Sequence, residues 1–120
     1  MNCRYRQYSL IKCKEVWYKE GKYHRDEVDP ETGFTLPAQI WVSGARYWYK
    51  EGKVYRDEKD PETGLTLPAK IEADGTQYWY KEGKPHRDEK DPSTGLTLPA
   101  VIWANGRQFW YKEGKNIVMM

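Results

Sequence analysis

Residues 38–53 read AQIWVSGARYWYKEGK and predict a β-hairpin. Two runs rich in β-branched and aromatic residues, 38–42 and 46–50, are separated by Ser43-Gly44. Such a pair tolerates positive φ at both turn positions and closes a two-residue hairpin loop. Glu51-Gly52 then forms the next turn, and a further strand leads away from it.

The outgoing strand of this hairpin is expected from Lys53 to Asp57. The same pattern returns along the chain every 31 residues. The motif WYKEGK begins at Trp17, Trp48, Trp79 and Trp110. The string RDE-x-DP-x-TG-x-TLPA follows three copies, from Arg25, Arg56 and Arg87. The expected organisation is one repeat domain with a divergent N-terminal cap, three units and a partial one, bounded at 1–16, 17–47, 48–78, 79–109 and 110–120.

Composition narrows the class of protein. The 120 residues include 20 Lys and Arg against 18 Asp and Glu, a net charge of +2, which argues against a nucleic-acid-coating protein. Aromatic residues make up 15%, so an ordered chain is expected. The start MNCRYRQYSLIKCK lacks an apolar signal segment, which predicts an intracellular, non-secreted protein. Cys3 and Cys13 are expected as reduced thiols, with a cross-strand disulfide as the alternative.

The string WYKEGK-x-H-R, followed by P-A-x-I-x-x-x-G-x-x-x-WY, resembles the MORN-like hairpin repeats of large DNA viruses, phages and protists. Those repeats have a period of about 23 residues. Here eight extra residues, DP-E-TG-F-TL and its copies, lie between Arg25 and Pro37 and account for the longer period. The resemblance implies a non-catalytic scaffold, and it makes a viral protein of the virion or the infected host cytoplasm the expected source.

Two strands per unit return the chain to the same direction, so that successive units can stack by translation. We therefore expect an all-β fold: an open, elongated antiparallel β-hairpin array with a 31-residue period rather than a closed barrel. At about 4.8 Å per strand the array should be roughly 30–40 Å long.

The tryptophan and tyrosine rows admit two interpretations. Alternation along a strand places Trp48 on one face and Tyr47 and Tyr49 on the other. One interpretation is a ring-lined groove for sugars, single-stranded bases or proline-rich peptide. The favoured interpretation is a ladder of aromatic contacts that forms the repeat core. The predicted core residues are Trp17, Trp48, Trp79, Trp110, Tyr49 and Tyr80.

Positions that vary between units are better candidates for an interaction surface. Trp41 and Trp103 occupy the same position as Glu72, which a buried stack would not readily accept. The candidate surface therefore comprises Trp41, Trp103 and Tyr23, together with Ile117 and Met119 at the apolar end. Unpaired sheet edges are expected at 3–11 and at 117–120.

Three further residue patterns suggest binding sites, but each has a simpler structural explanation. Arg25 and its copies suggest a phosphate-binding stripe, but the acidic residues that follow them should pair with them instead. Asp29 and the acidic residues near it suggest a calcium-binding loop. A turn is the simpler interpretation: Asp29 caps it, Pro30 fixes its backbone, and Gly33 leaves it with positive φ. His24 and its copy His86 lie a whole unit or more apart and are expected as strand residues with a satisfied ring nitrogen.

The sequence offers like groups along a line rather than unlike groups converging on a point, so no enzyme, cofactor, metal or small-molecule substrate is expected. The predicted function is a rigid repeat scaffold for protein–protein contacts, with a protein partner or a second copy. The alternative is a module that binds nucleic acid or a membrane surface through Lys, Arg and aromatic stripes. Nucleic acid is the less expected partner, and attraction to anionic lipid is expected to be weak.

Overall fold

The computed structural model describes residues 3–5 and 13–117, which form an all-β, antiparallel fold. No helix that could cross a membrane occurs among these residues. The strands are β1 (Cys3–Tyr5), β2 (Cys13–Lys19), β3 (Lys22–Tyr23), β4 (Gln39–Trp41), β5 (Arg46–Tyr47), β6 (Tyr49–Lys50), β7 (Lys53–Val54), β8 (Lys70–Ile71), β9 (Gln77–Tyr78), β10 (Tyr80–Lys81), β11 (Lys84–Pro85), β12 (Val101–Ile102), β13 (Gln108–Lys112) and β14 (Lys115–Ile117).

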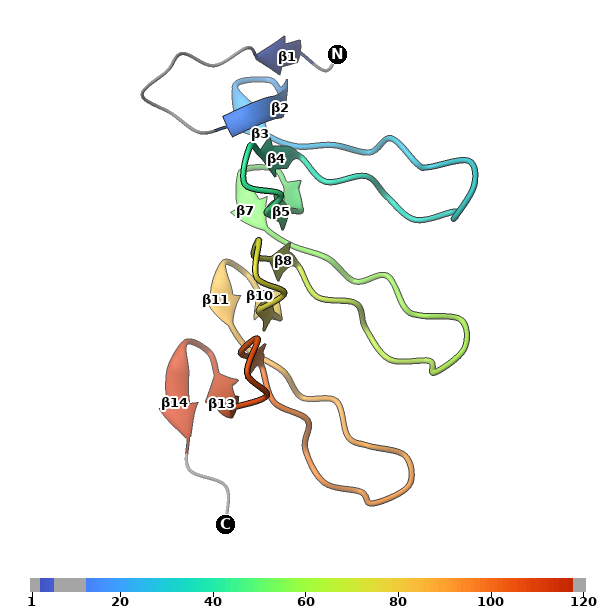
Figure 1. The fold of residues 1–120 in the computed structure, drawn as a ribbon, viewed down its shortest axis with the longest axis vertical. Coiled ribbons are helices and arrows are strands. Elements are labelled where there is room, and N and C mark those ends of the chain that lie inside the picture. The colour runs from blue at the N-terminus through green and yellow to red at the C-terminus, as the bar shows by residue number, and fades with distance from the viewer. Residues whose placement is uncertain (1–2, 6–12, 118–120) are drawn as a thin grey trace.

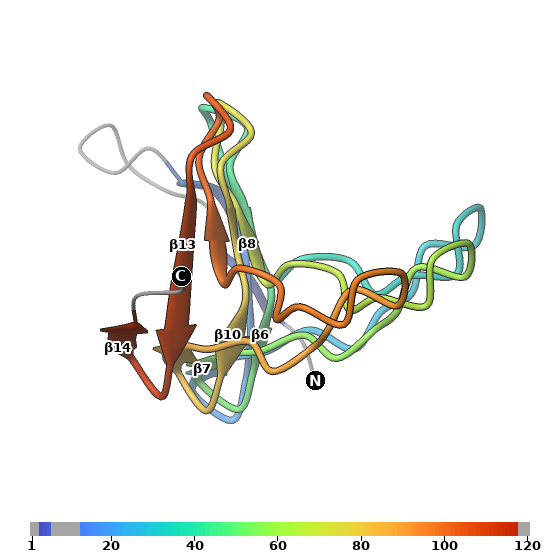
Figure 2. The same cartoon turned by 90° about the horizontal axis from the view of Figure 1, so that it is seen from below.

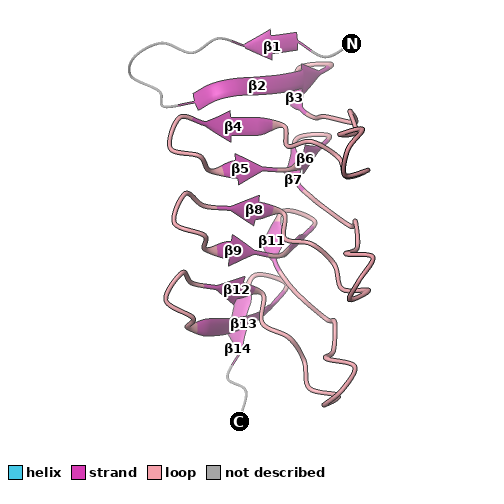
Figure 3. Ribbon diagram, turned by 45° about the vertical axis from the view of Figure 1, so that its right-hand side comes forward, coloured by secondary structure: helices cyan, strands magenta, loops and turns pink. Residues whose placement is uncertain are grey.

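Most strands belong to one sheet in the order β1-β2-β4-β5-β8-β9-β12-β13-β14, with β3 attached to β2 (Figures 1 and 3). The pairs β6–β7 and β10–β11 form two further hairpins. The order has two ends, β1 and β14, where unpaired edges were predicted, and the longest dimension is 45 Å. The register sets Cys3 opposite Tyr18 and Cys13 opposite Trp41.

Alanines hold neighbouring hairpins together through their backbones. Ala69 donates its N–H to the carbonyl of Tyr78 at 2.8 Å, and its own carbonyl accepts from the N–H of Trp48 at 2.9 Å. The same two bonds are made by Ala38 and Ala100. All three alanines are at most 1% exposed. Each hairpin is thus joined to the one before it at a residue whose side chain is only a methyl group.

The turns at Ser43-Gly44 and its copies differ from the prediction. Trp41 N–H donates to the carbonyl of Ala45, and the carbonyl of Trp41 accepts from Gly44 N–H, both at 2.9 Å. Residues 42–44 therefore form a three-residue loop between Trp41 and Ala45. Only the glycine has positive φ, 103° at Gly44. The reason is local: the residue before glycine accepts a hydrogen bond from the amide two residues on, as Asp74 Oδ1 does from Thr76 N–H at 2.9 Å. A three-residue loop with a left-handed glycine satisfies that bond.

The loop with positive φ at both positions is instead the Glu-Gly turn. Lys50 pairs with Lys53, which leaves Glu51 and Gly52 as a two-residue loop with φ of 52° and 85°. The same glutamate conformation recurs in every WYKEGK motif, at Glu20, Glu51, Glu82 and Glu113. A left-handed glutamate is strained, and the two-residue loop, which requires positive φ at both positions, imposes that conformation.

The predicted strands 46–50 and 53–57 are shorter than expected. Trp48 separates β5 from β6, because its N–H donates to the carbonyl of Ala69 while its own carbonyl accepts from Tyr55 N–H, both at 2.9 Å. The pairing partner therefore changes at Trp48. The outgoing strand ends at Val54, where the chain turns away into the inserted segment.

The inserted segments form three arms, defined as residues 26–36, 57–67 and 88–98. All three project from the same side of the sheet, and they lie beside one another along its length (Figures 1 and 2). The predicted arm turn is confirmed, since Asp29 Oδ1 accepts from Glu31 N–H at 2.8 Å and Gly33 has φ of 79°. Within the described part of the chain, no group of His, Cys, Asp and Glu gathers that could hold a metal ion.

Replacing a glutamate that has positive φ with a residue that tolerates this conformation better should stabilise the fold. Glu82→Asn should raise the free energy of unfolding by up to about 1 kcal/mol, because asparagine tolerates positive φ better than glutamate does. Urea unfolding followed by tryptophan fluorescence measures it. Asp74→Asn is the control, since Asp74 is not among the residues with positive φ and asparagine keeps the side-chain oxygen. Equal effects of the two substitutions would contradict the prediction.

Candidate interaction surface

One face of the sheet is built from stacked tryptophan and arginine side chains. The guanidinium of Arg56 lies 3.9 Å from the ring centroid of Trp48 and donates to Glu58 Oε1 and to the carbonyl of Pro68, both at 3.1 Å. The same stack joins Arg25 to Trp17 and Arg87 to Trp79, at 3.5 and 4.0 Å. The three arginine side chains are only 6–8% exposed. The predicted pairing of arginine with glutamate is confirmed, and it leaves these cations poorly placed to bind phosphate.

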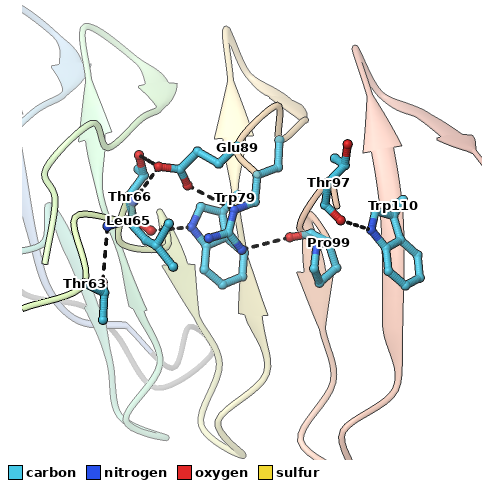
Figure 4. Close-up of polar contacts among 9 residues, drawn as sticks. Thr63, Leu65, Thr66, Trp79, Glu89, Thr97, Pro99 and Trp110 are labelled. Carbon is cyan, nitrogen blue, oxygen red and sulfur yellow. Dashed lines mark hydrogen bonds and ion pairs between the residues drawn. The ribbon is translucent and has the colours of Figure 1, made fainter. Parts of the chain in front are cut away.

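Each arm is held by the unit that follows it, through one threonine. Thr66 accepts at its carbonyl from Trp79 Nε1–H at 2.7 Å and donates its N–H to Glu89 Oε2 at 2.8 Å (Figure 4). The hydroxyl of Thr66 also donates to Glu89 Oε2. Thr35 makes the matching backbone contacts to Trp48 and Glu58, at 2.7 and 2.6 Å. The arms are therefore fixed to the tryptophan face instead of being free loops.

The histidines also connect neighbouring units. His24 Nδ1 accepts from the backbone N–H of Glu51 at 2.9 Å, and His86 Nδ1 accepts from that of Glu113 at 2.8 Å. Nε2 of His86 hydrogen-bonds to Asp88, which holds the pKa of that carboxyl below its ordinary value. Nε2 of His24 lies 2.9 Å from a carboxylate oxygen but is poorly aligned for a hydrogen bond. Both rings are buried after the strand rather than in it, which corrects the predicted placement.

The middle junction lacks these bonds, because Tyr55 stands where the other units have histidine. Its hydroxyl donates to Asp57 of its own unit at 2.8 Å. Gly52 N–H bonds to Tyr23 O and Gly114 N–H to Pro85 O, both at 2.9 Å. Among the described residues no such bond is made by the N–H groups of the 82–83 turn. At this turn the first two units and the last two thus share hydrogen bonds that the middle pair lacks.

The opposite face of the sheet is not covered by the arms, which all lie on the other side (Figure 2). It is lined by rings in contact: Trp41 with Tyr47 at 5.9 Å, Tyr23 with Tyr18 and Tyr49 at 5.0 Å each, Tyr78 with Tyr80 at 6.4 Å, and Trp103 with Phe109 at 4.6 Å. We call this the open aromatic face. The ammonium of Lys70 lies over its centre, 4.6–5.6 Å from three tyrosine rings.

The predicted core residues divide between the two faces. Trp48 and Trp79 are buried, at 6% and 7% exposed, under the arms. Trp17 and Trp110 are half-buried at the two ends of the same row. Tyr49 and Tyr80 are half-buried on the open aromatic face, where burial raises the pKa of both hydroxyls.

The predicted surface residues are only partly brought together. Trp103 is 40% exposed, whereas Trp41 is half-buried and its indole N–H is enclosed without a hydrogen-bond partner. Tyr23 lies half-buried in the tyrosine cluster. Ile117 ends β14, and Met119 lies outside the described residues.

Sequence reasoning missed the contact that joins the variable position to its neighbour. Tyr47 donates its hydroxyl to Glu72 Oε1 of the next unit at 2.8 Å, so the glutamate is partnered among aromatic rings. Burial and the nearby glutamate raise the pKa of Tyr47. The sequence pattern that could have predicted this contact is strand alternation, which places Tyr47 on the same face as residue 41 and its copies.

Hydrogen exchange should distinguish the junctions. The amides of Glu51 and Glu113 should be protected because histidine accepts from them, whereas the amide of Glu82 should exchange close to the unprotected rate. Tyr55→His should protect Glu82, and His24→Tyr should expose Glu51. Equal protection of the three glutamate amides in the wild-type chain would show that the histidines do not set the difference.

Low pH should weaken the hydrogen bonds that hold the arms to the sheet. Burial opposes ionisation of Glu89, but hydrogen bonds from Thr66 and Arg87 outweigh it and hold the carboxyl pKa below its ordinary value. Its contribution to stability is therefore present above the unfolded-state pKa of about 4.3 and is lost as the pH falls through the lower folded-state pKa.

Glu89→Gln should cost about 1–2 kcal/mol at pH 7 and flatten the loss of stability between neutral and acidic pH in urea melts. Glu27→Gln is the matched control, since Glu27 is 58% exposed and pairs with arginine but with no described threonine. A Glu27→Gln loss as large as that of Glu89→Gln would contradict this account.

Comparisons with known proteins give no relative to argue from: the chain matches no protein-family model, no curated protein and no solved structure.

Proposed function

We propose that the protein is a non-catalytic, MORN-like repeat scaffold that binds a protein partner, or a second copy of itself, through the open aromatic face. In this proposal the 31-residue units stack as an open array. The observation that carries it is the asymmetry of the sheet, because the arms cover one face and leave rings uncovered on the other. The resemblance behind the proposal also carries the expectation of a viral protein, in the virion or the infected host cytoplasm.

A scaffold suits this construction because its stiffness does not depend on the bound partner. Three Trp–Arg–Glu stacks and the threonine bridges fix the arms to one face. Aromatic side chains that are already ordered lose little conformational entropy on binding, and Trp and Tyr are enriched at interaction hot spots. The open aromatic face therefore offers a preorganised contact surface.

Nucleic acid and membrane binding receive less support from the geometry. The three repeat arginines are stacked on tryptophan and paired with glutamate, which leaves mainly lysines as available cations. Binding that rests on exposed lysines would weaken steeply with salt, whereas an aromatic protein contact would respond little.

The test compares three proteins of full length: wild type, Trp41→Ser/Trp103→Ser on the open aromatic face, and Leu96→Ser on an arm. Leu96 is 67% exposed and serves as the matched control for loss of surface apolar area. Sedimentation velocity measures self-association, and quantitative capture from a lysate of the producing cells measures other partners. The face variant should lose at least tenfold in self-association or capture of a given protein, and the arm variant should not.

Circular dichroism and thermal melts establish that each variant is folded. Equal association of all three proteins would overturn the proposal. Binding of labelled nucleic acid that disappears between about 50 and 200 mM salt would favour the electrostatic alternative instead.

A further inference from the structure

A hollow of about 460 Å³ lies between the hairpin tips of the second and third units, beside Trp103. Its wall includes the carboxylates of Glu72 and Asp74, the ring of Tyr78 and the exposed indole of Trp103. A hydrogen bond from Ala104 N–H to Thr76 Oγ1 at 3.0 Å joins the two tips. The hollow is therefore formed between two tips that are bonded to each other.

One substitution between units distinguishes this junction from the one before it. At the preceding junction Tyr47 donates its hydroxyl to Glu72 of the neighbouring tip. At this junction Trp103 stands in the place of the glutamate and offers no acceptor, so the equivalent Tyr78 makes no such bond. An aromatic wall and an acidic wall consequently face the same space.

The electrostatic character of the hollow is negative. Glu72 and Asp74 lie within ion-pair distance of no Lys, Arg or His among the residues described. Burial, followed by the charges of these two carboxylates, raises the pKa of Tyr78. The hollow thus favours a cation, even though the chain as a whole carries a charge of +2.

Arginine has the shape and charge that this combination of groups would bind. A guanidinium is flat, stacks on an indole and donates several hydrogen bonds to carboxylates. The protein itself uses this arrangement internally, where Arg56 stacks on Trp48 and donates to Glu58. In the hollow the tryptophan and the carboxylates are not joined by one guanidinium, because Arg107, whose guanidinium lies 5.3 Å from the Trp103 centroid, is not among the residues that line it.

We infer that the hollow binds an arginine side chain of a protein partner, with the guanidinium stacked on Trp103 and hydrogen-bonded to Glu72 or Asp74. This inference rests on the proposed function, since it specifies what the open aromatic face recognises. It assigns specificity to the junction of the second and third units, where the tryptophan of the third unit and the carboxylates of the second line the same hollow.

The test uses the ¹⁵N-labelled full-length chain and the tripeptide acetyl-Gly-Arg-Gly-amide. The chain has six tryptophans, and Trp103→Phe identifies the indole N–H signal of Trp103. Titration should shift that signal saturably. The citrulline tripeptide has nearly the same shape without the charge and should bind at least about tenfold more weakly.

The variant Glu72→Gln/Asp74→Asn should weaken binding of the arginine tripeptide at least about tenfold. Glu31→Gln/Glu62→Gln removes two acidic charges from arm turns and should change it less than about twofold. No saturable shift of the Trp103 signal, or equal binding of the arginine and citrulline tripeptides, would overturn the inference.

The two proposals fail separately. Loss of protein association in Trp41→Ser/Trp103→Ser without tripeptide binding would retain the scaffold and reject the arginine site. Tripeptide binding at Trp103 with unchanged association in the serine variant would retain the arginine site and reject the scaffold's use of this face.

Discussion

The structure depends on the bridge between an arm threonine and the tryptophan and glutamate of the following unit. Thr66 uses its carbonyl, its N–H and its hydroxyl for Trp79 and Glu89, so one residue fixes the inserted segment at two points. Because the acceptor glutamate also pairs with Arg87, the guanidinium stack and the arm are one connected network. Hydrogen bonds to charged groups shielded from water are among the stronger ones in proteins, at about 1.5–3 kcal/mol each.

This bridge makes the two faces of the sheet unequal. The eight extra residues in each unit do not interrupt the sheet, because they leave it after the short hairpins and return at the next alanine. They cover Trp48 and Trp79, which are buried, whereas Trp103 is 40% exposed and Tyr49 and Tyr80 are half-buried. The inserted segments therefore determine which face of the sheet the arms cover.

The units differ at a few positions, and these substitutions change the contacts between neighbouring units. Histidine at positions 24 and 86 accepts a backbone amide of the following unit, whereas Tyr55 turns its hydroxyl to its own aspartate. Trp103 stands in place of the glutamate that Tyr47 bonds one unit earlier, and it lines the hollow between two tips that Ala104 and Thr76 join. The positions that vary between the units thus set which bonds cross each junction and which groups line the hollow.

The sequence by itself predicted an all-β fold of antiparallel hairpins and placed Trp48 on the face opposite Tyr47 and Tyr49, because strand alternation and turn glycines are local properties. It also predicted the arm turn and the pairing of arginine with glutamate, whose partners lie two residues apart. The positive φ values of the Glu-Gly turn are a local property, but the sequence pattern predicted them at Ser43-Gly44 instead. Only the tertiary structure decided that histidine accepts from the next unit and that Tyr47 reaches Glu72. These two contacts join residues 27 and 25 positions apart, so no local pattern encodes them.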